Sequence, residues 1–186
     1  MKRYVIALAV GLLALSESRV EAQRFSLSTN LLDYACLGTM NIEGAYSVSR
    51  RWSLTIGADY NPFTFKTGQP EQFQLRQRSC SLGARLWPWH IWSGWWFAGK
   101  LRYQEYNEGG IISILTDEGE RAGAGLYAGY TYMISPHFNI EFGLGVWGGY
   151  DWFSSYSCQV CGLTQESGRR WFVLPDDIMI ALVYVF

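Results

Sequence analysis

Residues 138–151, FNIEFGLGVWGGYD, decide the fold class, because large apolar side chains alternate along them with small or polar ones. The apolar positions are Phe138, Ile140, Phe142, Leu144, Val146 and Tyr150, and the positions between them include Asn139, Glu141, Gly143, Gly145 and Asp151. Successive side chains of a strand point to opposite faces of a sheet, so a period of two predicts a β-strand with one apolar face.

The same alternation recurs along the chain and predicts eight strands. It is strong at 40–49, 52–61, 95–104 and 138–151, and weaker at 24–35, 74–87, 121–133 and 172–186. The connections after the third, fifth and seventh predicted strands are long, at 62–73, 105–120 and 152–171, whereas most of the others are short. Antiparallel hairpins with short turns at one end and long loops at the other are typical of an up-and-down β-barrel.

Residues 1–22 have the composition of a secretory signal peptide. A basic start precedes an apolar run from Tyr4 to Leu15, which is shorter than the roughly 20 residues of a membrane-spanning helix. We therefore expect one mature domain, residues 23–186. The formal net charge of −1 gives no indication of a nucleic-acid partner.

The alternation alone does not determine which face of the barrel is wet. A soluble lipocalin-like barrel would place the apolar register inside, where it could bind an apolar ligand, and a membrane barrel would place it outside. The polar register consists mostly of small residues, its charges are of both signs, and aromatic residues stand at the ends of the apolar register. These features favour an all-β, eight-stranded antiparallel transmembrane barrel of the outer membrane, in contact with lipid, with short periplasmic turns and longer outer loops. The soluble barrel remains the alternative.

The last six residues, ALVYVF, continue the apolar alternation to the end of the sequence. In a closed barrel the last strand pairs with the first, so such an end needs no polar tail. Leu182, Tyr184 and the terminal Phe186 also resemble the C-terminal signal of outer-membrane barrels. That resemblance implies recognition by the barrel-insertion machinery.

Several strings occur in an order and spacing that resemble one family. They are STNLLDYA at 28–35, RWSLTIGADYNPFTF at 51–65, YNEGGI at 106–111, FNIEFGLGVWGGYDWF at 138–153 and CQVCG at 158–162. The chain resembles an uncharacterised family, a domain of unknown function, of small outer-membrane barrels from anaerobic Gram-negative bacteria of the gut and mouth. The resemblance implies an eight-stranded barrel and an outer-membrane location. It implies no catalytic residue and no cofactor.

Six charged residues fall in the polar register and are expected to face the lumen: Glu43, Asp59, Arg85, Lys100, Arg102 and Glu141. The interior of an eight-stranded barrel is just wide enough to be filled by side chains. We therefore expect these charges to pair and to close the barrel. A small channel is the alternative function, and charge-neutral substitutions would then raise its conductance.

Cys158 and Cys161 form the sharpest local motif, in the predicted loop before the last strand. A local disulfide is the favoured interpretation, ahead of reduced thiols, and a metal site comes last because zinc needs about four ligands. Cys36 could approach this loop, and Cys80 lies in a strand as a small buried or lipid-facing residue.

Nucleophilic catalysis needs a base within hydrogen-bond reach of the nucleophile. The two histidines, His90 and His137, fall in predicted periplasmic turns. The tryptophans around His90, at positions 87, 89 and 92, suggest an interfacial anchor instead. We therefore expect no enzyme and no catalytic, metal or cofactor-binding residue.

The predicted outer loops remain as the functional surface. Residues 105–120 are acidic and contain a short apolar patch at Ile111–Leu115, which could contact a partner. The working hypothesis is a non-catalytic structural protein that presents its outer loops to a surface protein or another envelope partner.

Overall fold

The computed structural model describes residues 23–67, 72–110, 115–157 and 163–186. Two predictions lie outside these residues, namely the signal peptide at 1–22 and the disulfide between Cys158 and Cys161. Residues 111–114 of the predicted apolar patch also lie outside the described residues.

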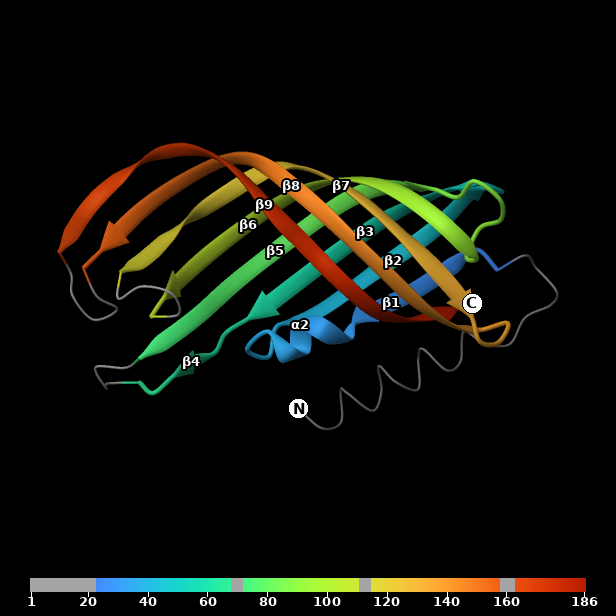
Figure 1. The fold of residues 1–186 in the computed structure, drawn as a ribbon, viewed down its shortest axis with the longest axis horizontal. Coiled ribbons are helices and arrows are strands. Elements are labelled where there is room, and N and C mark those ends of the chain that lie inside the picture. Colours follow the sequence, from blue (N-terminus) through green and yellow to red (C-terminus); the bar gives the residue numbers. More distant parts are fainter. Residues whose placement is uncertain (1–22, 68–71, 111–114, 158–162) are drawn as a thin grey trace.

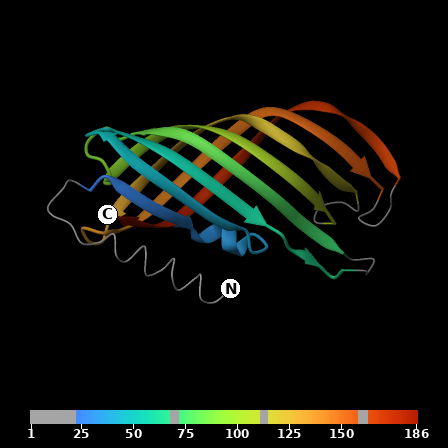
Figure 2. The ribbon, with the colours of Figure 1, turned by 180° about the vertical axis from the view of Figure 1, so that it is seen from behind.

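The described chain forms one antiparallel sheet that closes into a barrel (Figures 1 and 2). Its strands are β1 (Phe25–Asn30), β2 (Met40–Ser49), β3 (Trp52–Asn61), β4 (Thr64–Phe65), β5 (Phe73–Leu86), β6 (Gly94–Gly109), β7 (Thr116–Met133), β8 (Phe138–Tyr156) and β9 (Thr164–Val185). β3 pairs with β5, β1 pairs with β9, and the short β4 extends the sheet beside β5. The prediction of an all-β fold with eight antiparallel strands in a ring is confirmed.

The two faces of the barrel wall have opposite polarity, and the apolar face is the outer one. Ile56, Leu126 and Leu144 are 66%, 73% and 66% exposed, whereas Glu141 on the inner face is 1% exposed. The inner face also buries Ser53 and many other small polar side chains. The lipocalin-like alternative, which needs the apolar register inside, does not match this arrangement.

The long loops predicted at 105–120 and 152–171 are mostly strand. β6 and β7 run to Gly109 and from Thr116, and β8 and β9 run to Tyr156 and from Thr164. Residues 111–114 and 158–162, which follow β6 and β8 in the sequence, lie outside the described residues. The prediction of loop was wrong because both faces of these segments are polar, which removes the contrast that a period of two requires.

The predicted first strand, 24–35, is also wrong at its end, because β1 stops at Asn30. A short helix, α2 (Leu31–Ala35), follows it. The Asn30 side chain caps this helix by accepting a hydrogen bond from the Leu32 backbone N–H and donating one to Asp33. Within the described residues, no helix has both the length and the apolar character needed to cross a membrane.

β9 contains an irregularity that explains its weak alternation. Gly143 of β8 pairs with Met179, but Gly145 pairs with Asp176, so β9 carries an extra residue at this point. A bulge of this kind moves the side chains that follow it to the other face. Pro175 lies beside the bulge and provides no backbone N–H to the ladder.

The C-terminal residues close the ring and fill its end. Ser26 pairs with Val185, and the Phe186 N–H donates to the Phe25 carbonyl at 2.8 Å. Val183 and Val185 are buried inside the barrel. Three further residues form part of the outer face: Leu182, Tyr184 and Phe186, with the Tyr184 ring 4.7 Å from that of Phe186 and 4.9 Å from that of Phe138.

Candidate functional site

The lumen holds a cluster of ion pairs, which we call the lumen cluster: Glu43, Asp59, Arg85, Lys100, Arg102 and Glu141. Glu43 is its centre, because its two carboxylate oxygens lie 2.6 Å from Arg85 Nη2 and 2.6 Å from Lys100 Nζ. Arg85 also donates to Glu141 at 2.8 Å. Thr131 completes the shell of Glu141 with a hydrogen bond of 2.9 Å.

Asp59 and Arg102 form the second part of the lumen cluster. Arg102 Nη2 lies 2.8 Å from the Asp59 carboxylate, which also accepts a hydrogen bond from Ser79. The structure therefore brings together all six charges that the sequence places in the polar register. With three cations and three anions, the cluster is formally neutral, which limits the cost of keeping these groups away from water.

Each cation of the lumen cluster also lies over an aromatic ring on the inner face. The Arg85 guanidinium carbon is 4.2 Å from the Trp96 ring centroid, and Lys100 Nζ is 4.8 Å from that of Tyr127. Arg102 lies 5.3 Å from the Trp147 ring. Such cation–π contacts are favourable where water is excluded, so rings and charges together fill the lumen.

Glycines on β7 and β8 provide the space for these rings. A Cβ on Gly145 would lie 2.1 Å from the Tyr127 ring, and one on Gly129 would lie 2.4 Å from the Trp96 ring. No real side chain tolerates such distances. The glycines of the polar register thus serve packing, because each leaves a gap that a large ring occupies.

Two tryptophans close the short-turn end of the barrel. Trp87 and Trp92 are 0% and 3% exposed, and their rings meet edge to face at 5.7 Å. Trp87 donates to Ser53 at 3.1 Å, and Trp92 donates to the Gln23 carbonyl at 3.0 Å. The expectation of an interfacial anchor was wrong for these two residues and fits Trp89, which is 70% exposed.

A second polar cluster, which sequence reasoning missed, lies toward the opposite end. We call it the wall cluster: Tyr106, Glu108, Asp117, Arg121, Asp151 and Arg170. Asp151 is 0% exposed and accepts hydrogen bonds from Tyr106 at 2.8 Å and from Arg170 at 2.7 Å. Arg121 pairs with Glu108 at 2.7 Å and stacks 3.6 Å from the Tyr106 ring centroid.

The surroundings of Tyr106 in the wall cluster favour its protonated hydroxyl. Burial raises the pKa of the Tyr106 hydroxyl above its ordinary value; Arg121 lowers it in part, and the hydrogen bond to Asp151 raises it further. Tyr106 therefore stays protonated as a donor. The sequence contained a signal for this cluster, because Asp151 continues the polar register of 138–151 and lies opposite both Arg121 and Arg170.

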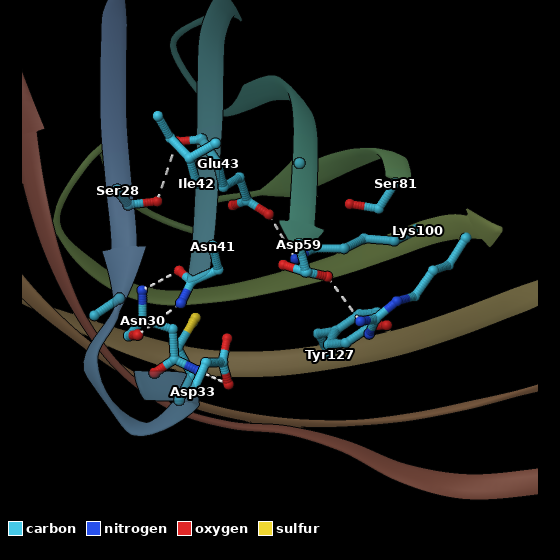
Figure 3. A pocket seen from close by; sticks show the side chains of 14 residues that line it. Ser28, Asn30, Asp33, Asn41, Ile42, Glu43, Asp59, Ser81, Lys100 and Tyr127 are labelled. Atoms are coloured by element: carbon cyan, nitrogen blue, oxygen red, sulfur yellow. Dashed lines mark hydrogen bonds and ion pairs between the residues drawn. The ribbon is translucent and has the colours of Figure 1, made fainter. Parts of the chain in front are cut away.

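A small polar cavity lies beside the lumen cluster (Figure 3). Its volume is about 40 Å³, and Glu43, Asp59, Lys100 and Tyr127 point toward it. One water needs about 10–15 Å³, whereas sites for small organic ligands usually measure about 300–1,000 Å³. The cavity can hold water or a small ion among charges that already have partners.

The remaining candidate residues lie apart from both clusters. Cys36 and Cys80 are exposed free thiols, and Cys80 stands on the outer face. His90 is exposed in the turn after β5, and His137 Nδ1 contacts the Val185 carbonyl at 2.8 Å. In the described part of the chain, no three His, Cys, Asp or Glu side chains are grouped as a metal site would require.

Comparison with known families matches residues 7–186 to the model described as "Protein of unknown function (DUF3575)". The chain belongs to this family. No curated protein matches the chain. The predicted membership of an uncharacterised family is therefore confirmed.

Proposed function

We propose that this protein is a non-catalytic outer-membrane β-barrel, sealed by its own side chains, that anchors a raised part of its wall at the cell surface. The supporting observation is the inverted polarity of the barrel: leucines and isoleucines cover the outside, and paired charges fill the inside. In water this arrangement would expose a large apolar surface. In a bilayer it is the favourable one.

The apolar outer face has limits that match a bilayer. Four paired residues lie side by side across β6 to β9, and three of them are aromatic: Tyr103, Ala122, Tyr150 and Trp171. They form the upper aromatic row. The next outward row contains charged residues: Arg78, Glu105 and Glu120. At the short-turn end, Trp52, Trp95, Tyr130, Phe138 and Tyr184 form the other aromatic row.

The distance between the two aromatic rows also fits. β6 carries one residue of each row, Trp95 and Tyr103, so nine residues of this strand run from one row to the other. A strand tilted by about 45° crosses a membrane with about 9–11 residues. We therefore place the short turns in the periplasm and the other end outside the cell, as in outer-membrane barrels of Gram-negative bacteria.

Five strands, β5 to β9, continue beyond the upper aromatic row. The parts of β6, β7, β8 and β9 at this end form what we call the wall extension: residues 104–109, 116–121, 151–156 and 164–171. β8 continues for six residues beyond Tyr150, to Tyr156, and at about 3.3 Å per residue this is on the order of 20 Å of strand. The wall cluster links these four strands through side chains. The wall extension, rather than long flexible loops, is the surface that we propose the anchor presents to an envelope or surface partner.

Three other functions receive less support. An apolar ligand would need an empty apolar interior, and in the described lumen aromatic rings, paired charges and small polar groups occupy the space. A channel would need an open lumen, and the rings and ion pairs occupy it. An enzyme would need a base beside a nucleophile, and His90 and His137 lie at the short-turn end.

Fractionation of expressing cells, followed by electrophoresis in SDS with and without boiling, tests the proposal. Closed membrane barrels resist unheated SDS and migrate as compact species. We expect the protein in the outer membrane, with a band that shifts on boiling. A soluble periplasmic protein without a shift would contradict the proposal.

A further inference from the structure

One edge of β9 is paired along only a small part of its length. β8 pairs with β9 from Thr164 to Tyr184, but β1 pairs with the other edge from Ala181 to Val185. Between Thr164 and Ile180, no strand of the described residues pairs with this second edge. The barrel is thus closed at its base and has an open seam above Asn30.

The lower part of the seam is protected by local devices. The Asn30 side chain accepts a hydrogen bond from the Ile180 N–H at 3.0 Å. The helix α2 follows directly, and Pro175 and the β9 bulge interrupt the regular edge that a strand would need. The edge from Glu166 to Val173 has neither a proline nor a bulge, and a second register shift lies at its outer end, between Thr164 and Glu166.

The unprotected part of the edge is long and exposed. Trp171 and Val173 are 72% and 79% exposed, and each residue from Thr164 to Trp171 is exposed. Its position is nevertheless fixed against β7 and β8, because Arg170 is bound to Asp151 at 2.7 Å and to Asp117 at 3.2 Å. A fixed edge loses little conformational entropy when another strand binds to it.

We propose that the β9 edge from Thr164 to Val173 is a docking site for an extended segment of a second polypeptide, which adds to the sheet as a further strand. Strand addition satisfies the free N–H and C=O groups of an edge, and side chains on alternate positions give specificity. Arg169, Trp171 and Val173 share one face by alternation, so the segment should offer an acidic residue near Arg169 and apolar residues beyond it. This inference rests on the proposed function, since it identifies the type of partner that the wall extension binds.

Other occupants satisfy the edge less well. Lipid chains have no hydrogen-bonding groups, so an unpaired edge at the height of Val173 is costly in a bilayer. A helix uses its own backbone groups internally and cannot extend the ladder. A second copy that pairs antiparallel through the same edge would be inverted, so two copies in one membrane cannot pair in this way.

The test uses the full chain in detergent micelles with a synthetic peptide as the probe. The peptide alternates Thr and Val around a central Glu and is joined by a disulfide and a flexible Gly/Ser linker to Cys36, beside the seam. Cys80→Ser, Cys158→Ser and Cys161→Ser make the attachment specific. The tether gives an effective concentration in the millimolar range, so weak binding is still measured.

Amide hydrogen exchange of β9 provides the result. We expect exchange within residues 164–173 to slow at least tenfold, with no change in β6 and β7. The matched control peptide has every second amide N-methylated on one edge, which prevents ladder formation without removing apolar side chains. Unchanged exchange, equal protection by both peptides, or protection that appears without peptide as the protein concentration rises would each overturn the proposal. The heat-dependent gel shift of the same sample reports separately on the barrel, so the failure of docking and the failure of the membrane proposal are distinguishable.

Discussion

The lumen cluster and the wall cluster use the same chemistry at different depths. In the lumen, the side chains of Arg85 and its partner Glu141 are 3% and 2% exposed. In the wall cluster, the side chain of Arg170 is 42% exposed although that of its partner Asp151 is 1% exposed. The comparison teaches that losing one partner of an ion pair costs much folding free energy where the other partner cannot reach water. The cost is smaller where one partner is already exposed to water.

The largest expected effect comes from breaking the lumen cluster. Arg85→Met leaves both Glu43 and Glu141 buried beside a neutral side chain, so we expect the free energy of unfolding to fall by about 3–5 kcal/mol. Urea unfolding in detergent micelles, followed by tryptophan fluorescence, measures it. Arg78→Met is the matched control, because Arg78 pairs with Glu105 at the exposed outer face and should change little. Equal losses in both variants would remove the distinction between the two depths.

The packing of the lumen gives the next largest effect. Gly145→Ala places a methyl group against the Tyr127 ring, and we expect a loss of about 1–3 kcal/mol from overpacking. Gly99→Ala is its control, since a Cβ there has no atom within 4 Å. The ratio of unboiled compact band to unfolded band, measured across a temperature series, compares the two. If the two variants melt alike, the rings do not fill the space that the glycines leave.

Breaking the wall cluster should have a smaller and more local effect. Asp151→Asn removes the shared charge from Arg121 and Arg170, and we expect a cost of about 1–3 kcal/mol. We expect this cost to appear as faster amide exchange in residues 104–109 and 151–156, with the lower barrel unchanged. Exchange that increases equally in β2 and β3 would show that the two clusters form one cooperative unit.

The smallest expected effect concerns conductance. Lys100→Met removes a lumen charge, but Tyr127, Trp147 and the remaining pairs still fill the space. Recordings in planar bilayers should therefore show no increase in single-channel current relative to the unsubstituted protein. A sharp increase would support a gated channel and would contradict a sealed lumen.

The strands between the two aromatic rows could be predicted from the sequence. Their outer face is apolar, and the residues of their inner face are mostly small or charged. The contrast predicted the starts of three strands where the structure has them, at Met40 for β2, Trp52 for β3 and Phe138 for β8. In the wall extension polar residues occur on both faces, as at Asp117 and Glu118, so alternation does not predict that the same strands continue there. α2 could have been found from Asn30 and Asp33, which have the spacing of an N-cap pair.

The sequence predicted which charged residues belong to the lumen cluster, but not which of them form ion pairs with one another. Alternation places Glu43, Arg85 and Glu141 in one register, yet their distances depend on how far each strand is staggered against the next. That stagger is a property of the closed ring. Trp87 and Trp92 were misplaced for a related reason, since a turn rich in tryptophan has the same composition whether it folds into the lumen or lies at an interface.

The central claim is that the apolar outer face meets lipid and that the wall extension stands outside it. Depth-dependent quenching by brominated lipids tests this directly, with an environment-sensitive label on single cysteines in a chain whose four native cysteines are replaced by Ser. Labels at Leu126→Cys and Leu144→Cys should be strongly quenched in reconstituted vesicles, and a label at Ser154→Cys on the wall extension should be quenched little. Equal quenching at all three positions, or none at Leu126 and Leu144, would contradict the account.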